Sequence, residues 1–253
     1  MKRVVVKVGS AVLTQNSEIA LERMRSLVSF LAELKKENDV ILVSSGAVAA
    51  GYTELQLDRS ILKNKQALAA IGQPVLMNKY AKKFLEHNII TAQVLVTAAN
   101  LNRNEEIVRI KDTVDTLLAN GVIPIVNEND ATATEELIVG DNDQLSAYIT
   151  KHTDSDLLII LSDIDAYYDK DPRANDDAKV LKEVHYITPE ELSRDVSPNN
   201  IFATGGIVTK LKAADYLLRS DRDMFLASGF DLSDVKSFMI EKTHKGGTLF
   251  TRK

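Results

Sequence analysis

The chain has 253 residues, of which 45% are hydrophobic and 26% charged, the ordinary composition of a globular protein with one large or two small domains. Its formal net charge is −5 and it has no basic tail, which argues against nucleic acid or an anionic membrane surface as a partner. The absence of cysteine excludes disulfides, thiolate metal ligands and a cysteine nucleophile.

The N-terminus carries no recognisable targeting segment. Met1-Lys2-Arg3 leads directly into a run of valines that is far too short for the core of a signal peptide. No other apolar run approaches the roughly 20 residues that a membrane helix needs. We therefore expect a cytoplasmic protein with no membrane partner.

Short runs rich in β-branched residues alternate with helical patterns along the chain. The runs predict strands at residues 4–8, 40–43, 89–96, 122–126, 157–161 and 224–227. Their nearly continuous apolar character is typical of parallel strands that are covered on both faces. The patterns between them predict helices over 24–36, over about 65–87 with a kink or a break at Pro74, and over 107–118 before Asn120-Gly121. The alternation favours an α/β fold, a three-layer α/β/α sandwich around a central, mainly parallel sheet.

No repeat, low-complexity tract or Gly/Ser linker marks a domain boundary, so we expect a single domain over residues 1–253. The most loop-like region is 163–200, where Pro172, Pro189 and Pro198 interrupt the periodicity. We expect this region to lie over the functional face and not to form a second domain.

Polar clusters stand where four of the predicted strands end or the next helix begins. They are Lys7-Val8-Gly9-Ser10, Ser44-Ser45-Gly46-Ala47, residues 127–130 with 140–143, and residues 204–206 with Lys210. In open α/β sheets the ligand crevice lies beyond the carboxyl ends of the strands. The four clusters therefore predict one shared site.

Lys7 interrupts a strand of valines. A buried ammonium is costly unless an anion meets it, although a lysine at a strand end often reaches solvent instead. Gly9 lets backbone approach a ligand closely, and Ser10 adds a hydroxyl donor. This combination suits a phosphate oxygen.

Two glycine segments have alternative interpretations. At Ser44, Ser45 and Gly46, backbone N–H groups and hydroxyls could converge on an anion, or a serine could simply cap the next helix. Likewise, Thr204 could cap a helix with an apolar face, or Lys210 could lie close to a phosphate at the positive end of that helix. Neither segment matches a Walker loop or a G-x-G-x-x-G dinucleotide fingerprint.

Acids and amides follow the predicted strand 122–126 at once, as Asn127-Glu128-Asn129-Asp130. A second group, Asp141-Asn142-Asp143, opens the next helix, where Asp141 or Asp143 could act as a cap. The second group does not fit an EF-hand calcium loop. Two acids with lysines near one anion indicate phosphoryl transfer.

In this order, and together with Ser162-Asp163 and Asp171-Pro172-Arg173, these clusters resemble the amino acid kinase family over essentially the whole chain. The lysine and glycine elements are shared across that family, whereas the run 127–130 is the more specific signal for members that act on glutamate. The resemblance implies transfer of the ATP γ-phosphoryl group to the side-chain carboxylate of L-glutamate. The product would be L-glutamyl 5-phosphate, formed at the first step of proline biosynthesis.

The resemblance also implies roles for single residues. Lys7 and Lys210 would neutralise charge on the transferring group, and Asp143, with Asp141 as a weaker companion, would orient the lysines. The residues that would hold glutamate are Ser45, Asp130 and Asn142, with Ser44 and Gly46 beside them. Those that would line the ATP site are Lys7, Gly9, Ser10, Ser162, Asp163, Thr204, Gly205, Gly206, Ile207, Val208, Thr209 and Lys210. Mg²⁺ is expected with ATP, and no residue is assigned as a metal ligand.

The resemblance further implies feedback inhibition by proline at or beside the glutamate site, and a homo-oligomer. Many relatives append a C-terminal PUA domain that resembles RNA-binding modules, whereas this sequence ends at Lys253, so we expect the kinase domain alone and no nucleic-acid partner. Two alternatives remain open. One is another activity of the same family, as in N-acetylglutamate kinase, uridylate kinase or aspartokinase, and the other is a non-catalytic amino-acid sensor.

Overall fold

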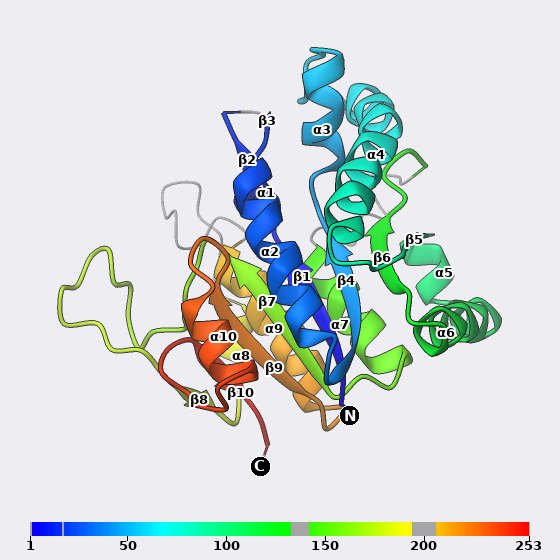
Figure 1. The fold of residues 1–253 in the computed structure, drawn as a ribbon. Coiled ribbons are helices and arrows are strands. Elements are labelled where there is room, and N and C mark those ends of the chain that lie inside the picture. The colour runs from blue at the N-terminus through cyan, green and yellow to red at the C-terminus, as the bar shows by residue number, and fades with distance from the viewer. Residues whose placement is uncertain (1, 17, 133–141, 194–205, 253) are drawn as a thin grey trace.

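A computed structural model describes residues 2–16, 18–132, 142–193 and 206–252. Its centre is an eight-stranded sheet with helices on both faces (Figure 1). The order across the sheet is β5 (Thr91–Val96), β6 (Ile123–Glu128), β4 (Asn38–Ser44), β1 (Lys2–Val8), β7 (Leu157–Ser162), β9 (Asp223–Ser228), β10 (Thr248–Phe250) and β8 (Glu183–Val184). The six strands from β5 to β9 are parallel, and β10 is antiparallel to β9. The predicted fold class is confirmed.

The helices form two layers. The layer that contains α2, α4 and α10 packs on the face to which Val4, Val6 and Val8 point, and the layer that contains α6, α7 and α9 packs on the other face. The helices are α1 (Ser10–Leu13), α2 (Leu21–Leu34), α3 (Ala47–Glu54), α4 (Leu62–Leu85), α5 (Ala98–Leu101), α6 (Asn104–Ala119), α7 (Asn142–His152), α8 (Pro189–Leu192), α9 (Gly206–Leu218) and α10 (Ser233–Met239).

All six predicted strands and the predicted helices are present, and Pro74 lies inside α4 without dividing it. The prediction missed a small hairpin, β2 (Thr14–Gln15) with β3 (Glu18–Ile19), and the short strands β10 and β8 at one end of the sheet. The loop-like region does contribute to the sheet, because β8 pairs with β10. Its first part also packs there, since the backbone N–H of Tyr167 donates to Thr248 Oγ1 at 2.8 Å.

The central strand β1 alternates its side chains between the two layers. Val4, Val6 and Val8 face the α2 layer, so Lys7 faces the α7 and α9 layer together with Val5. The carboxyl ends of the six parallel strands meet at one edge of the sheet. Both described chain ends lie at the opposite, amino edge, because Lys2 begins β1 and the antiparallel β10 runs back toward it (Figure 1).

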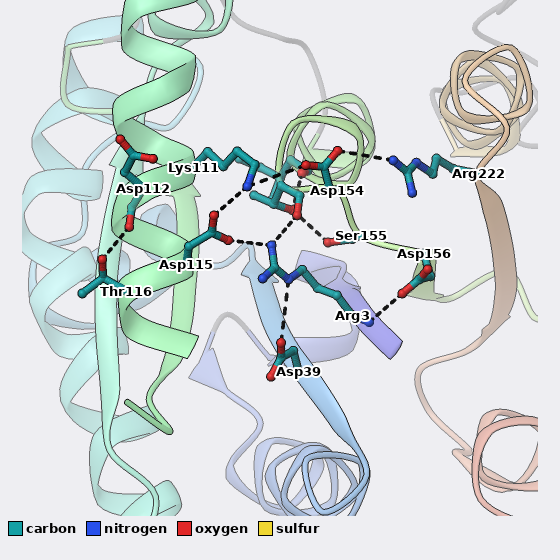
Figure 2. A network of polar contacts seen from close by, with 12 residues as sticks. Arg3, Asp39, Lys111, Asp112, Asp115, Thr116, Asp154, Ser155, Asp156 and Arg222 are labelled. Atoms are coloured by element: carbon teal, nitrogen blue, oxygen red, sulfur yellow. Dashed lines mark hydrogen bonds and ion pairs between the residues drawn. The ribbon is translucent and has the colours of Figure 1, made fainter. Parts of the chain in front are cut away.

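A polar network holds the amino end of β1 against the helix layer that contains α6 and α7 (Figure 2). The Arg3 guanidinium donates to Asp115 Oδ1 on α6 at 2.6 Å and to the carbonyl oxygen of Thr153, just beyond α7. Lys111 also donates to Asp115, at 2.6 Å. Lys7, on the same strand as Arg3, contacts Asp143 at the beginning of α7. The two side chains therefore hold α7 near its two ends.

We expect Arg3→Leu to lower the free energy of unfolding by about 1–3 kcal/mol at pH 7, because charged hydrogen bonds are lost. Burial alone raises the pKa of Asp115, but hydrogen bonds from Lys111 and Arg3 outweigh it, and the pKa lies below its usual value. A carboxyl with a lowered pKa stabilises the fold above its unfolded pKa, and this contribution is lost as the pH falls through the folded pKa. Urea unfolding of both proteins across acidic pH measures it.

The matched control is Arg25→Leu, which removes an exposed ion pair with Glu22 and is expected to change stability by no more than about 0.5 kcal/mol. Equal effects of the two substitutions, or a difference between wild type and Arg3→Leu that grows on acidification below about pH 4, would contradict this role of Arg3.

Candidate active site

Two lysines from opposite ends of the chain share one buried carboxylate. Lys7 Nζ lies 2.6 Å from Asp143 Oδ1, and Lys210 Nζ lies 3.1 Å from Asp143 Oδ2. Lys7 is 3% exposed, Lys210 4% and Asp143 0%, so the interpretation that Lys7 reaches solvent is wrong. Together these side chains carry one net positive charge away from water, which makes the cluster suited to an anion.

Lys7 comes from β1, and the N-terminal parts of α7 and α9 supply Asp143 and Lys210. Asp143 lies in the first turn of α7, where a carboxylate is favourable at the positive end of the helix dipole. On α9, Thr209 Oγ1 donates to Asp143 Oδ2 at 2.9 Å, and Lys210 Nζ also donates to the Gly206 carbonyl oxygen at 2.9 Å. These bonds hold the lysine side chain along the first turn of its helix.

Gly9 and Ser10 follow β1 directly. The Gly9 backbone N–H donates to the Leu161 carbonyl oxygen at 3.0 Å and so continues the pairing with β7. A Cβ at Gly9 would lie 3.7 Å from Lys7 Nζ, so glycine leaves the space beside the ammonium open. Ser10 begins α1 and is exposed.

A cavity of about 420 Å³ opens at the carboxyl edge of the sheet, beside the start of α3. Four of the residues expected to hold the acceptor substrate line it, namely Ser45, Gly46, Asp130 and Asn142. Its lining is Ser10, Thr14, Ser45, Gly46, Ala47, Val48, Ala49, Arg59, Asn127, Glu128, Asp130 and Asn142. We call it the acceptor cavity.

The turn into α3 depends on glycine. Gly46 is the N-cap residue, its φ is +107°, and no side chain caps the helix, so the interpretation of a capping serine is wrong. A side chain is disfavoured at this φ. The turn leaves Ser45 facing the cavity, where its hydroxyl meets Asn142.

A chain of amide hydrogen bonds orients the polar groups of the acceptor cavity. The Glu128 backbone N–H donates to Asn127 Oδ1 at 2.9 Å, which identifies that oxygen as an acceptor. Asn142 Nδ2 therefore donates to Asn127 Oδ1 at 3.2 Å and to Ser45 Oγ at 2.8 Å. Because the Ser45 oxygen accepts this bond, its own O–H can donate into the cavity, and Asn142 Oδ1 can accept there.

Helix α4 supports this chain from behind. Asn127 Nδ2 donates to Gln73 Oε1 at 3.0 Å, and Gln73 Nε2 donates to Gln93 Oε1 at 3.0 Å. Helix α4 packs closely against α3 at two glycines. A Cβ at Gly51 of α3, or at Gly72 of α4, would lie 1.9 Å from a backbone oxygen of the other helix. Gln73 also borders a smaller cavity of about 160 Å³ that shares Asp130 with the acceptor cavity.

Neighbouring residues join the two parts of the site. Asn142 faces the acceptor cavity and Asp143 holds the lysines, so the first turn of α7 places an acceptor group next to a cationic cluster. Burial raises the pKa of Asp130 above its usual value. The arrangement can bind a small zwitterion beside a phosphate and can stabilise negative charge that moves between them.

The remaining predicted residues lie as follows. Ser44 is buried and its hydroxyl lies 2.9 Å from the Tyr80 hydroxyl, directed toward α4. Ser162 Oγ donates to Asp163 Oδ1 at 2.8 Å, just beyond β7. The side chains of Ile207 and Val208 are buried in the core, so a nucleotide could meet only their backbone. Asp141, Thr204 and Gly205 lie outside the described residues. The functional roles of all these residues stay predictions.

Sequence reasoning missed Gln73 and Arg59. Gln73 stands among helix-forming residues before Pro74, and Arg59 lies in a loop, so neither occupies a position that a local pattern marks. Asn127 was noted within its motif, but its place between the Glu128 backbone and Asn142 depends on the fold.

The described part of the chain has neither a cluster of metal-ligating side chains nor a helix that could cross a bilayer. No group of three or more acidic, histidine or cysteine side chains is arranged to hold a metal ion there. None of its helices combines the length and the apolar character that crossing a bilayer requires.

Comparison with known proteins places these features in context. Residues 2–228 match the amino acid kinase family. The chain is 52% identical over its full length to glutamate 5-kinase from Wolinella succinogenes, covering 98% of that protein. It is 49% identical to glutamate 5-kinase from Leishmania donovani, with 99% of this chain and 95% of that protein covered.

Solved structures share the fold at low sequence identity. Isopentenyl phosphate kinase from T. acidophilum, in a product complex, has a TM-score of 0.67 and 16% identity, with 98% of this chain and 99% of that one covered. Carbamate kinase from Giardia lamblia, bound to AMP-PNP, has a TM-score of 0.66 and 17% identity, with 99% and 98% covered.

Proposed function

The chain belongs to the amino acid kinase family, and from this premise we propose that it transfers the γ-phosphoryl group of ATP to the side-chain carboxylate of L-glutamate. The observation that carries the proposal is the buried Lys7–Asp143–Lys210 cluster, which adjoins an acceptor cavity through Asn142. The full-length similarity to proteins named glutamate 5-kinase supports glutamate as the acceptor.

The reaction needs little acid–base chemistry. A side-chain carboxylate oxygen attacks the γ-phosphorus, the bond from that phosphorus to the β,γ-bridging oxygen breaks, and ADP leaves with the electron pair. The products are ADP and L-glutamyl 5-phosphate, an acyl phosphate. Because a carboxylate is already nucleophilic, positioning and charge stabilisation supply most of the acceleration.

The cationic cluster performs the charge stabilisation. Lys7 and Lys210 neutralise the oxygens of the transferring group, and Asp143 keeps the two ammoniums together against their mutual repulsion. Mg²⁺ would accompany ATP at this site. Because Asp143 is already paired with two lysines, the ion would be held by phosphate oxygens and waters and would supply positive charge to the phosphates.

The acceptor cavity holds L-glutamate. Asp130 pairs with the α-ammonium, the Ser45 hydroxyl donates to a carboxylate oxygen, and Asn142 accepts from the ammonium through Oδ1. Ser162 and Asp163, just beyond β7, and the start of α9, where Gly206 lies close to the Ile164 side chain, form the nucleotide side.

Asp130 gives the proposal a testable pH dependence. Its raised pKa means that its carboxyl gains a proton at higher pH than an ordinary aspartate, and the neutral form no longer attracts an ammonium. We expect the KM for glutamate to rise as the pH falls through that pKa. In Asp130→Asn, KM should be high at neutral pH and should lose this dependence. Initial rates from pH 5 to 8 measure it, and parallel profiles for both proteins would count against Asp130.

The acceptor itself is tested by ADP release. The protein is incubated with ATP, Mg²⁺ and one of L-glutamate, N-acetylglutamate, uridylate or L-aspartate. Glutamate is expected to give the highest kcat/KM. A higher value with another acceptor assigns the chain to another branch of the family, and glutamate binding with no turnover of any acceptor makes it a sensor.

The proposal has further parts. It takes residues 1–253 as a single kinase domain that acts in the cytoplasm as a homo-oligomer, with a product that enters proline biosynthesis. Proline is the proposed feedback inhibitor at or beside the acceptor cavity. Inhibition that is relieved by added glutamate, together with the mass in solution from light scattering, tests these parts.

A further inference from the structure

Arg59 supplies a positive charge to the acceptor cavity. It lies in the loop between α3 and α4, and among the described residues that line the cavity it is the cationic one, whereas Glu128 and Asp130 are acidic. The cavity is therefore equipped at different points for a carboxylate and for an ammonium.

The guanidinium of Arg59 is held but not neutralised. It stacks over the ring of Tyr52, 4.3 Å from the ring centroid, which restricts the side chain without removing its charge. Within the residues that the structure describes, no acid pairs with it. An arginine in this state keeps its fork of N–H donors for a ligand.

Asp58, the acid next to Arg59 in the chain, accepts hydrogen bonds from within the loop. Asp58 Oδ1 accepts from the Ser60 backbone N–H at 2.9 Å and from the Ser60 hydroxyl at 2.7 Å, and these bonds lower the pKa of Asp58. Asn64 Nδ2 donates to the Asp58 carbonyl oxygen at 2.9 Å and ties the turn to the start of α4. The loop is therefore shaped by its own contacts, and within the described residues Asp58 forms no ion pair with Arg59.

The charges of the substrate leave one group for Arg59 to bind. L-Glutamate has an α-ammonium, a side-chain carboxylate that must face the lysine cluster, and an α-carboxylate. Asp130 suits the ammonium, and Lys7 and Lys210 lie at the phosphoryl end. The α-carboxylate needs a cation elsewhere on the cavity wall, and a guanidinium binds carboxylates with two parallel hydrogen bonds.

We propose that Arg59 binds the α-carboxylate of the amino-acid substrate and thereby selects acceptors in which this group is free and charged. Tyr52 acts as a positioning residue by holding the guanidinium against α3. The inference rests on the proposed function, because it assumes that the acceptor is an α-amino acid.

The test compares L-glutamate with its α-amide, in which the α-carboxylate is replaced by a neutral group while the side-chain carboxylate is kept. With wild type, we expect kcat/KM to be about 100-fold higher for glutamate. In Arg59→Met, the KM for glutamate should rise about 30-fold with kcat within about threefold, and the preference over the α-amide should fall to a few-fold. Arg59→Lys should lie between the two, because a lysine keeps the charge but loses the planar fork.

Further variants separate positioning from general damage. Tyr52→Phe keeps the ring and is expected to keep the glutamate KM within about twofold, whereas Tyr52→Leu should raise it several-fold. Arg25→Met removes an exposed arginine on α2 that pairs with Glu22, and it should change neither KM nor the preference. Circular dichroism establishes that each variant is folded.

Equal losses of kcat/KM for both substrates in Arg59→Met would leave the preference unchanged and would overturn the inference. The α-carboxylate would then be held by other groups, such as the backbone N–H groups at the start of α3. Failure of the proposed function looks different, since wild type then phosphorylates neither compound. In that case calorimetric binding of glutamate and of the α-amide still decides the role of Arg59. Tighter wild-type binding of glutamate that Arg59→Met abolishes supports it, and equal binding of the two compounds rejects it.

Discussion

Asp143→Asn is expected to lower kcat at least about 100-fold and to lower the free energy of unfolding by about 3–5 kcal/mol. The substitution keeps the size of the side chain but removes the negative charge between two buried ammoniums, which then repel each other in a site of low dielectric. ADP release measures the first effect and urea unfolding the second.

Asp115→Asn provides a matched control for this prediction. Asp115 also bridges two cations, Arg3 and Lys111, but at the amino edge of the sheet and in partial contact with solvent. Because these pairs are partly buried, its substitution should cost less stability than Asp143→Asn, and it should leave kcat within about twofold because the site is at the other edge of the sheet. If Asp143→Asn retained wild-type kcat, the contacts of Asp143 with Lys7 and Lys210 would have no part in turnover.

Lys210→Ala is expected to lower kcat about 1,000-fold while the KM for glutamate changes less than about threefold. The ammonium of Lys210 contacts Asp143 and the Gly206 carbonyl oxygen, whereas the acceptor cavity is lined by other residues. Asp143 also keeps its contact with Lys7, so the fold should survive. Steady-state kinetics with varied glutamate at saturating ATP measure both constants.

Lys212→Ala is the control for Lys210→Ala, because Lys212 is exposed on the same helix two residues later. It removes the same charge from α9 and should leave the kinetics unchanged. Wild-type turnover in Lys210→Ala would remove this lysine from the mechanism, and a large rise in the glutamate KM would place it in acceptor binding.

The sequence predicted the parallel core of the fold because its strands are apolar on both faces. Strands such as β4 and β7 are nearly continuous aliphatic runs, which few other structures accommodate. The strands β10 and β8 have three and two residues, too few for a period to be read, and each exists only through pairing with a distant neighbour. Such short strands depend on the assembled fold.

The same contrast divides the site. Lys7 was detectable because a charge inside a valine strand violates the local pattern, and such violations indicate function. Gln73 violates nothing: a glutamine is an ordinary helix residue, and its importance comes from an amide 54 positions away. Arg59 is likewise an ordinary loop residue until the fold places it on a cavity wall.

Because both described ends of the chain lie at the amino edge of the sheet, attachments made there stay away from the chemistry (Figure 1). A purification tag or a linker to a biosensor surface, joined at either end, leaves the cavity open to small molecules, so each binding experiment above can use immobilised protein. Trimming is a different matter. Removal of the first eight residues takes away strand β1 and the Lys7 ammonium together.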